Sequence, residues 1–516
     1  MKLLEPAQDD QQIANQALLH LESVVAIDSA SDEDSSTIPS TVGQTTLARR
    51  VGEFFGGLGA RVEQDDYANV IATFDGRGVG EGSAPLALMV HLDTAKGTVA
   101  VPHLQLAREW NGTALAWEAN PSLQVDTETF PTLNDFVGQD LLHGPGDAPF
   151  GLDDKLGLTH MMSLAWLLHE NPEIPHPPLL LIGRPDEEIG RMEALLGLAQ
   201  LLAERGVRTG YTVDGIAPFE INVENFNAAG ASILFEREST HLEGSLLAIR
   251  LLGVNTHGAT ARAEGHRTAL RLAAEVLQLC QAKVVSLVSN PDRDCDADLI
   301  LDCQTPDSVR RALEDVVSPH RPRGAGWQEL AVPEDFSADS ACDQLIRFVQ
   351  RFLDSTPGFT LLAEDSEGHD GYSHPYRAVP TEAGIRLDLR LRDFTEAGLR
   401  SRIEHVAGLS KNRASIEHQY VNMGPRLSDR PELVRWAREA AEALGIEAPQ
   451  LPIRGGTGVD PFLDAGIAVG NLGTGYFAPE SEKELTSMSM LSGHAKWLVA
   501  LVQVAATATA EDSRAS

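Results

Sequence analysis

Long apolar runs and a cleavable leader are both missing from this sequence of 516 residues. No stretch of about 18 consecutive apolar residues occurs, which excludes a typical transmembrane helix. The opening residues, MKLLEPAQDDQQ, lack the apolar stretch and the small-residue cleavage site of a signal peptide. We therefore expect a cytoplasmic protein without a membrane partner.

Cysteine is also scarce in this chain. The four cysteines are Cys280, Cys295, Cys303 and Cys342. None of them forms a CxxC pair, which is the spacing typical of zinc-binding and redox motifs. We expect reduced, mostly structural thiols, and the alternative is a structural metal or a disulfide within this group.

Basic residues are few compared with acidic ones. Lysine and arginine number 41 against 75 aspartates and glutamates, which gives a formal net charge of −34. Non-specific nucleic-acid binding requires a basic face, so we expect no nucleic-acid partner. We interpret the negative charge as a feature that keeps the protein soluble. The alternative explanation is adaptation to a salt-tolerant host.

The order of predicted elements indicates an α/β fold. A chain of this length suggests two or three domains, and its apolar content of 42% allows a sizeable core. Strands that alternate with helices are typical of a sheet with crossover connections. The nearly continuous apolar run PLALMVHLDT is typical of a central strand buried on both faces. The predicted strands are 70–74, 85–94, 178–183 and 211–214, and the predicted helices are 11–27, 46–58, 155–169 and 191–204.

The pattern changes after about Ala229 and returns to the α/β style after Asn422. Strands of a different sheet are predicted at 231–236, 245–255 and 384–394. We predict an α/β domain, with a mixed, mostly parallel sheet between helices, made of residues 1–228 and 423–516. A smaller α+β domain, residues 229–422, interrupts it and contains an acidic, irregular insertion near 286–360.

Four short segments place histidine or carboxylate side chains at the ends of predicted strands or the start of a helix. Sites in open α/β sheets lie at the carboxyl ends of strands. Each segment alone has an ordinary explanation, such as a structural histidine, a helix N-cap or a solvated acidic turn. Together they describe a site for Zn²⁺ or Mn²⁺. The segments are His91-Leu-Asp93, Gly151-Leu-Asp153-Asp154-Lys155, Pro185-Asp186-Glu187-Glu188 and Tyr211-Thr-Val-Asp214.

These segments also resemble a known family. HLDT, GLDDKLG, PDEEIG and YTVDG are similar, in order and spacing, to the motifs of peptidase T, a tripeptide aminopeptidase among the dinuclear zinc peptidases. The stretches PSTVGQ, ENFNAA, NTHGATAR, RLRDF and IRGGT have further counterparts in that family. The resemblance covers nearly the whole chain except the insertion near 286–360, and it implies a catalytic domain with a lid.

The resemblance implies a role for each residue of the site. His91 and Asp214 would bind the first zinc ion, Asp153 would bridge, and Glu188 would bind the second, with Mn²⁺ or Co²⁺ as alternatives. Asp93 would hold the imidazole of His91. Glu187 would be the general base of hydrolysis by a metal-activated water.

Further residues are implied in substrate binding. His257 of the lid would stabilise the oxyanion, in its own subunit or in the neighbouring subunit of a homodimer. Arg454 and Arg392 would hold the carboxylate of the peptide. Asn225 and Asn227 would either hydrogen-bond the substrate backbone or have a structural role.

The resemblance fails at the last metal ligand, where the family has a histidine. This chain has Phe477 or Pro479 there, depending on the alignment, and neither can ligate. Three alternatives follow. Glu480 or Glu482 replaces the histidine, or the second metal is weakly bound, or the second site is lost and the protein binds peptides without cleaving them. In addition, the family motif RGGTDG reads RGGTGVD in this chain.

The combined prediction is a metal-dependent aminopeptidase that releases the N-terminal residue of short peptides, including tripeptides. A related carboxypeptidase or N-acyl amino acid deacylase is the alternative among enzymes. A catalytically impaired peptide-binding homologue is the alternative outside them.

Overall fold

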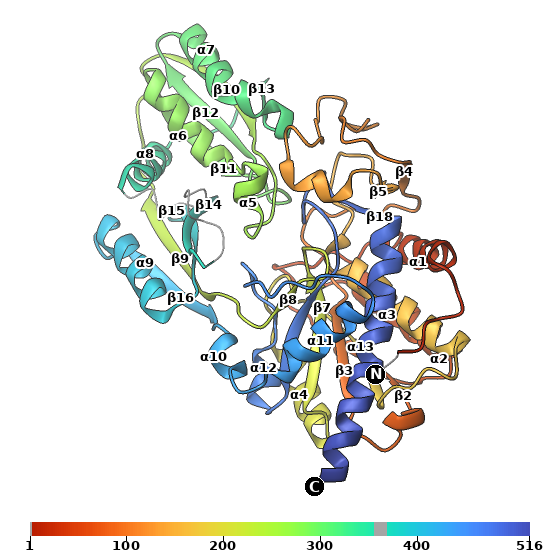
Figure 1. The fold of residues 1–516 in the computed structure, drawn as a ribbon. Helices are drawn as coiled ribbons and strands as arrows, with labels where there is room; N and C mark the ends of the chain where they lie inside the picture. Colours follow the sequence, from red (N-terminus) through yellow and green to blue (C-terminus); the bar gives the residue numbers. More distant parts are fainter. Residues whose placement is uncertain (1–2, 356–368, 516) are drawn as a thin grey trace. The chain divides into compact units, whose positions relative to one another are not determined.

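A computed structural model describes residues 3–355 and 369–515 of the chain (Figure 1). The chain divides into two compact units. Unit 1 comprises Met1–Gly112, Leu133–Asn225 and Met423–Ser516, and unit 2 comprises Thr113–Thr132 and Phe226–Asn422. The segment Thr113–Thr132, which the sequence analysis assigns to the first domain, therefore groups with unit 2. Within unit 2 the backbone N–H of Gln124 donates to the carbonyl oxygen of Pro322 at 3.0 Å.

Unit 1 is built on a seven-stranded mixed sheet, which confirms the predicted α/β class. The four inner strands run parallel, and the outer strands β1, β2 and β8 pair antiparallel. The inner strands are buried along their length because helices cover the sheet, as their apolar sequences predict. In sheet order the strands are β1 (Arg61–Gln64), β2 (Val70–Phe74), β6 (Leu179–Arg184), β3 (Leu86–His91), β7 (Thr209–Gly215), β17 (Ala468–Gly473) and β8 (Ile221–Asn222).

The helices of unit 1 pack on this sheet and on each other. Helix α3 packs against β3 and β7, and α1 and α13 pack against α3. Their apolar faces form one core with the strands. None of the helices in the part that the structure describes is long and apolar enough to cross a membrane. The main helices are α1 (Asp10–Val25), α2 (Val42–Gly57), α3 (Leu152–Glu170), α4 (Glu193–Glu204), α11 (Glu432–Ala443) and α13 (Met488–Ala515).

A small antiparallel sheet also belongs to unit 1. Its order is β18 (Leu485–Ser487), β5 (Leu141–His143) and β4 (Gln105–Ala107). Strand β18 immediately follows the segment in which the family's last histidine is missing. Pairing of β18 with β5 therefore fixes the end of that segment.

Unit 2 contains two four-stranded antiparallel sheets. Helices α6 (Ala269–Leu279), α7 (Pro306–Val317), α8 (Ser340–Ser355) and α9 (Glu396–Leu409) accompany them. The first sheet has the order β11 (Ala282–Ser289), β12 (Ala297–Cys303), β10 (Ser245–Leu252) and β13 (Gly326–Leu330). The second has the order β14 (Tyr372–Thr381), β15 (Gly384–Asp393), β9 (Asn227–Glu236) and β16 (Ala414–Tyr420).

The prediction of an irregular insertion near 286–360 is wrong for its described part. That part contains β12, α7, β13 and α8, and residues 356–360 lie outside the described residues. Helices α7 and α8 expose mostly charged side chains of both signs and bury apolar side chains at helical spacing, including Val309, Leu313, Leu345 and Phe352. The high acidic content concealed this periodicity. All four cysteines have free thiols.

Candidate metal and catalytic site

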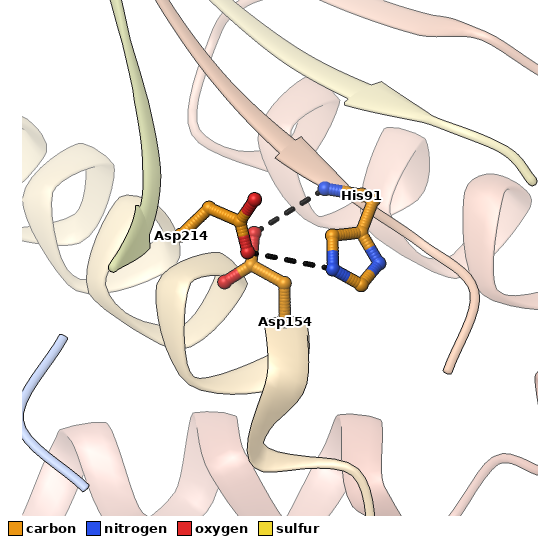
Figure 2. Close-up of side chains that lie close together, drawn as sticks. All are labelled: His91, Asp154 and Asp214. Carbon is orange, nitrogen blue, oxygen red and sulfur yellow. Dashed lines mark hydrogen bonds and ion pairs between the residues drawn. The ribbon is translucent and has the colours of Figure 1, made fainter. Parts of the chain in front are cut away.

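The ends of two neighbouring parallel strands bring the first group of candidate ligands together. His91 ends β3, Asp214 lies near the end of β7, and Asp154 lies in the first turn of α3 (Figure 2). The Nε2 atom of His91 is 3.4 Å from Oδ1 of Asp214. One ligand atom from each of the three residues lies within 4.8 Å of the others. This spacing allows one cation to contact all three.

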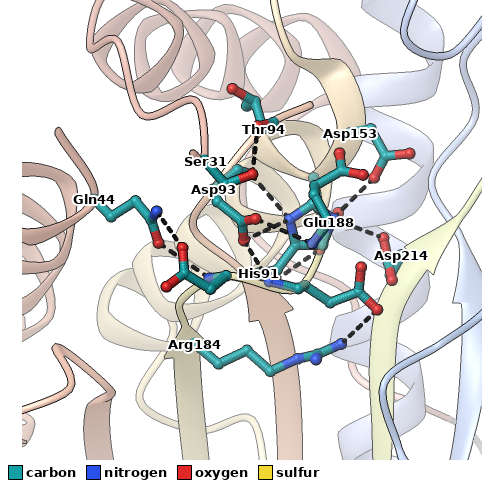
Figure 3. Close-up of polar contacts among 12 residues, drawn as sticks. Ser31, Gln44, His91, Asp93, Thr94, Asp153, Arg184, Glu188 and Asp214 are labelled. Atoms are coloured by element: carbon teal, nitrogen blue, oxygen red, sulfur yellow. Dashed lines mark hydrogen bonds and ion pairs between the residues drawn. The ribbon is translucent and has the colours of Figure 1, made fainter. Parts of the chain in front are cut away.

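A second group shares the same histidine. One ligand atom each from His91, Asp153 and Glu188 also lies within 4.8 Å of the others (Figure 3). The Nε2 atom of His91 is 3.0 Å from Oδ1 of Asp153. His91 therefore stands between two sets of carboxylates.

The orientation of the His91 ring is fixed by Asp93. The Nδ1 atom of His91 lies 2.9 Å from the backbone carbonyl oxygen of Asp93, which can only accept, so Nδ1 donates. In the neutral ring this leaves the lone pair of Nε2 facing the carboxylates of Asp153 and Asp214. Such a ring is prepared to bind a cation through Nε2.

Besides its predicted contact with His91, the carboxylate of Asp93 holds the neighbouring turn. It accepts from the backbone N–H groups of Glu187 at 2.9 Å and Glu188 at 3.0 Å. Its Oδ1 atom is 3.4 Å from Nδ1 of His91, a longer contact than that of the carbonyl. The fully buried side chain of Asp93 thus connects the histidine segment to the turn that carries both glutamates.

The acidic side chains of this cluster disfavour one another's charge. Burial and the charge of Asp214 raise the pKa of Asp154 well above its ordinary value. Burial raises the pKa of Asp214 to about 7, in spite of the opposing effect of His91. Burial and the charge of Glu480 raise the pKa of Glu188. A cation between these groups would oppose all three shifts, because it favours the charged carboxylates.

The donor set fits a divalent metal ion. The Oε1 atom of Glu188 is buried and has no hydrogen-bond partner among the described residues. An unpaired buried oxygen carries a cost of about 1–3 kcal/mol, which a metal ligand does not incur. Imidazole nitrogen with several carboxylate oxygens is a donor set that suits zinc or manganese.

Burial lowers the pKa of His91, but the carboxylates of Asp214, Asp153 and Asp93 outweigh this effect and raise it well above the ordinary value. The carboxylates thus favour a positive charge at this position. A metal ion would supply this charge and displace the proton.

The sequence analysis named Asp154 in its segment but assigned a role only to the neighbouring Asp153. Its carboxylate is buried and also accepts from the backbone N–H of His91 at 3.3 Å. Gly157 makes room for it, because a Cβ atom there would come within 2.2 Å of Oδ1 of Asp154. The consecutive acids Asp153 and Asp154 were the available signal.

The first acid of the PDEE turn points elsewhere. Asp186 accepts from the side-chain hydroxyl and backbone N–H of Ser40 and from the side-chain amide of Gln44. Both partners lie in the PSTVGQ stretch, which resembles the family. The structural role of this stretch is to bind Asp186. Asp186 anchors the turn, and Glu188, two residues later, lies in the metal-ligand cluster (Figure 3).

The segment 475–484 reaches the same cluster without a histidine. The hydroxyl of Tyr476 donates to Oδ2 of Asp153 at 3.0 Å. The Oε2 atom of Glu484 accepts from the backbone N–H groups of Phe150, Gly151 and Leu152 at 2.9, 2.9 and 3.3 Å. Its Oε1 atom accepts from the N–H of Glu480 at 3.0 Å. Glu484, which the sequence analysis did not identify, therefore holds the loop before Asp153 and the loop at Glu480.

The two candidate replacement ligands differ in their surroundings. Among neighbouring charges, that of Glu480 is the first cause of the raised pKa of Glu188 after burial. Glu482 is buried instead beside Lys483, with its Oε1 atom 3.7 Å from Nζ. Of the two, Glu480 is thus the one that acts on the metal-ligand cluster.

The remaining predicted residues are not members of the two ligand groups. Asn225 accepts from the N–H of Met423 at 2.7 Å, and Asn227 accepts from the N–H of Asn422 at 3.1 Å. Both buried amides thus make hydrogen bonds within the fold. His257 accepts from the N–H of Ala259 at 3.2 Å.

The two predicted arginines differ in location. Arg392, in unit 2, donates to the carbonyl oxygens of Ala229 and Leu391 and lies over the ring of Tyr420. Arg454 is half-buried in unit 1, four residues before Gly458. Their predicted contacts with the peptide carboxylate stay predictions.

A mixed α/β sheet with imidazole and carboxylates at its parallel strand ends defines a metal-dependent hydrolase. Residues 124–504 match the sequence profile of peptidase family M20/M25/M40. The chain belongs to this family, and the resemblance drawn from the motifs is confirmed.

Individual relatives support the same assignment. Peptidase T of Macrococcus caseolyticus is 25% identical over 468 residues, which cover 88% of this chain and 90% of that protein. Peptidase T of an Exiguobacterium species is 33% identical over 219 residues, which cover 42% of this chain and 52% of that protein. The solved structure of a tripeptidase from Staphylococcus aureus shares the fold, with a TM-score of 0.51 at 14% identity, over 96% of this chain and 99% of that one.

Proposed function

We propose that this chain is a metal-dependent aminopeptidase that releases the N-terminal residue of short peptides such as tripeptides. The observation that carries the proposal is His91, which is shared by two groups of metal-ligand side chains beside the Glu187–Glu188 pair. The similarity to proteins named peptidase T favours this substrate class over those of other hydrolases. The predicted homodimer and the cytoplasmic location stay predictions.

We assign the ligands of two metal ions, with zinc as the first choice and manganese or cobalt as alternatives. His91, Asp214 and Asp154 would surround one ion, and Glu188 with Asp153 would hold the other. Bound metal ions would supply Lewis-acid chemistry, since they polarise a carbonyl group and lower the pKa of water.

Glu187 would perform the proton transfers of hydrolysis. Its side chain is partly exposed at 16%, in contrast to the buried Asp93 that holds its backbone. It would take a proton from the water that attacks the scissile carbonyl carbon and deliver it to the leaving nitrogen. One C–O bond forms, the peptide C–N bond breaks, and a free amine is released. His257 would stabilise the oxyanion, and Arg454 and Arg392 would bind the carboxylate of the peptide.

The decisive experiment is hydrolysis of a tripeptide after chelation and after addition of Zn²⁺, Mn²⁺ or Co²⁺, with the products identified by mass. We expect a free N-terminal amino acid and a dipeptide, no turnover after chelation, and recovery with metal. Release of the C-terminal residue would indicate a carboxypeptidase, and cleavage of an acetylated amino acid would indicate a deacylase. No turnover with any of the metals would contradict the proposal and favour a peptide-binding homologue.

We further propose that Glu480 replaces the missing histidine as a ligand of the second metal. Glu480→Gln is expected to reduce the bound metal from about two ions to one per chain, because the amide oxygen lacks the charge that zinc binding requires. Glu482→Gln is the matched control, since its carboxylate lies beside Lys483. Elemental analysis of both purified variants measures the difference. Two ions in the Glu480 variant, or one in both, would refute this assignment.

A further inference from the structure

Arg184 is a fully buried arginine at the end of β6, next to the PDEE turn. Its NH2 atom donates to the backbone carbonyl oxygen of Thr457 at 3.0 Å. The same atom is 3.7 Å from Oε1 of Glu187 (Figure 3). The guanidinium group thus lies between the proposed general base and the loop that follows Arg454.

Most of the donor capacity of this guanidinium is unused. The Nε and NH1 atoms are buried and find no hydrogen-bond partner in the part of the chain that the structure describes. A buried arginine is usually paired in full, because desolvation of the charge costs several kcal/mol. Fold stability alone therefore does not account for Arg184 at this position.

Gly458 creates the space that the guanidinium occupies. A Cβ atom at this position would lie 2.3 Å from NH1 of Arg184 and 2.9 Å from Oε1 of Glu187. The backbone of Gly458 also has a φ of +56°, which glycine adopts more easily than other residues. Arg184 and Gly458 therefore form a matched pair.

We propose that Arg184 is a positioning residue for the reaction, and that its guanidinium holds the carboxylate of Glu187 in the orientation needed for proton transfer. Through Thr457 it also couples this carboxylate to the 453–458 loop. The inference rests on the proposed aminopeptidase function and deepens it. Because Arg184 is buried, it acts through Glu187 and does not contact the substrate.

The test compares Arg184→Met and Arg184→Lys with the wild-type enzyme loaded with metal. Methionine fills a similar volume without charge. It also removes a buried charge whose Nε and NH1 atoms have no hydrogen-bond partner among the described residues, and the Glu187 side chain left behind is partly exposed at 16%. We expect kcat of the methionine variant to fall about 100-fold, the usual effect of a misplaced catalytic group, with KM within about threefold. The lysine variant is expected to recover part of kcat. The melting temperature and the metal content of both variants should match the wild type.

A double-mutant cycle with Gly458→Ala supplies a second measurement. The added methyl group would displace NH1, so this variant is expected to lose kcat as well. In the Arg184→Met background the same change should have little further effect on kcat, because its target is absent. If the kcat losses of Arg184→Met and Gly458→Ala multiply in the double variant, the two residues act independently, and the proposal is overturned.

Three other outcomes would overturn the positioning role. The first is an unchanged kcat in Arg184→Met, and the second is a rise in KM alone. The third is a loss of kcat that parallels a loss of metal or a lower melting temperature. Turnover by the wild type is measured in the same series. If the wild type shows no turnover, both the proposed function and this inference are refuted. If the wild type turns over and Arg184→Met has the same kcat, this inference alone is refuted.

Discussion

Glu187→Gln is expected to lower kcat for tripeptide hydrolysis by about 10³-fold, within the range that a general base contributes. Glutamine has nearly the same shape but cannot take a proton from water at neutral pH. The backbone N–H of residue 187 would still donate to Asp93, so the turn should keep its position. Steady-state kinetics at saturating metal, together with metal analysis, measures the effect.

The control for this variant is Glu193→Gln, a change of an exposed glutamate at the start of α4. It should leave kcat and metal content at the wild-type level. Retention of most of the activity by Glu187→Gln would exclude Glu187 as the base. Peptide binding by a wild-type protein that hydrolyses nothing would instead support the non-catalytic alternative.

His91→Ala is expected to have the largest effect on metal binding. His91 belongs to both groups of ligand side chains, whereas each of the other members belongs to one. Loss of this ligand should weaken the binding of the ion assigned to His91, Asp214 and Asp154 by more than about 100-fold, since changes of supporting groups alone cost 10–100-fold. Titration with Zn²⁺ against a competing chelator measures the affinity, and hydrolysis should fall to background.

His176→Ala is the matched control for a buried histidine. Its Nδ1 atom lies 2.8 Å from the carbonyl oxygen of Pro177, and it belongs to neither group of candidate ligands. This variant should bind metal as the wild type does, even if its fold is somewhat less stable. Two tightly bound ions in His91→Ala would show that the ligands lie elsewhere.

The recurring strand-end pattern made most of the candidate site predictable. A buried parallel strand must end at the edge of the sheet, so a polar side chain directly after it faces that edge. This rule brought His91 and Asp214 together from separate motifs, and the structure places them 3.4 Å apart. The apolar runs of β3 and β6 likewise revealed the centre of the sheet.

Other features had no such local signal. Arg184 directly follows the predicted strand 178–183, and only its contacts with Thr457 and Gly458 reveal a buried guanidinium. Glu484 is more than 330 residues from the loop whose backbone it binds. The acidic composition near 286–360 concealed two amphipathic helices and two strands.

The sequence by itself was enough to predict the fold class, the peptidase family and His91, Asp153, Glu188 and Asp214 as candidate metal ligands. These follow from apolar periodicity and from short motifs, which depend on neighbours along the chain. The tertiary structure alone brought Asp154 into the first group, separated Glu480 from Glu482 and placed Arg184 beside Glu187. Those features depend on distances between segments that are remote in sequence, and such distances are set only when the whole core packs.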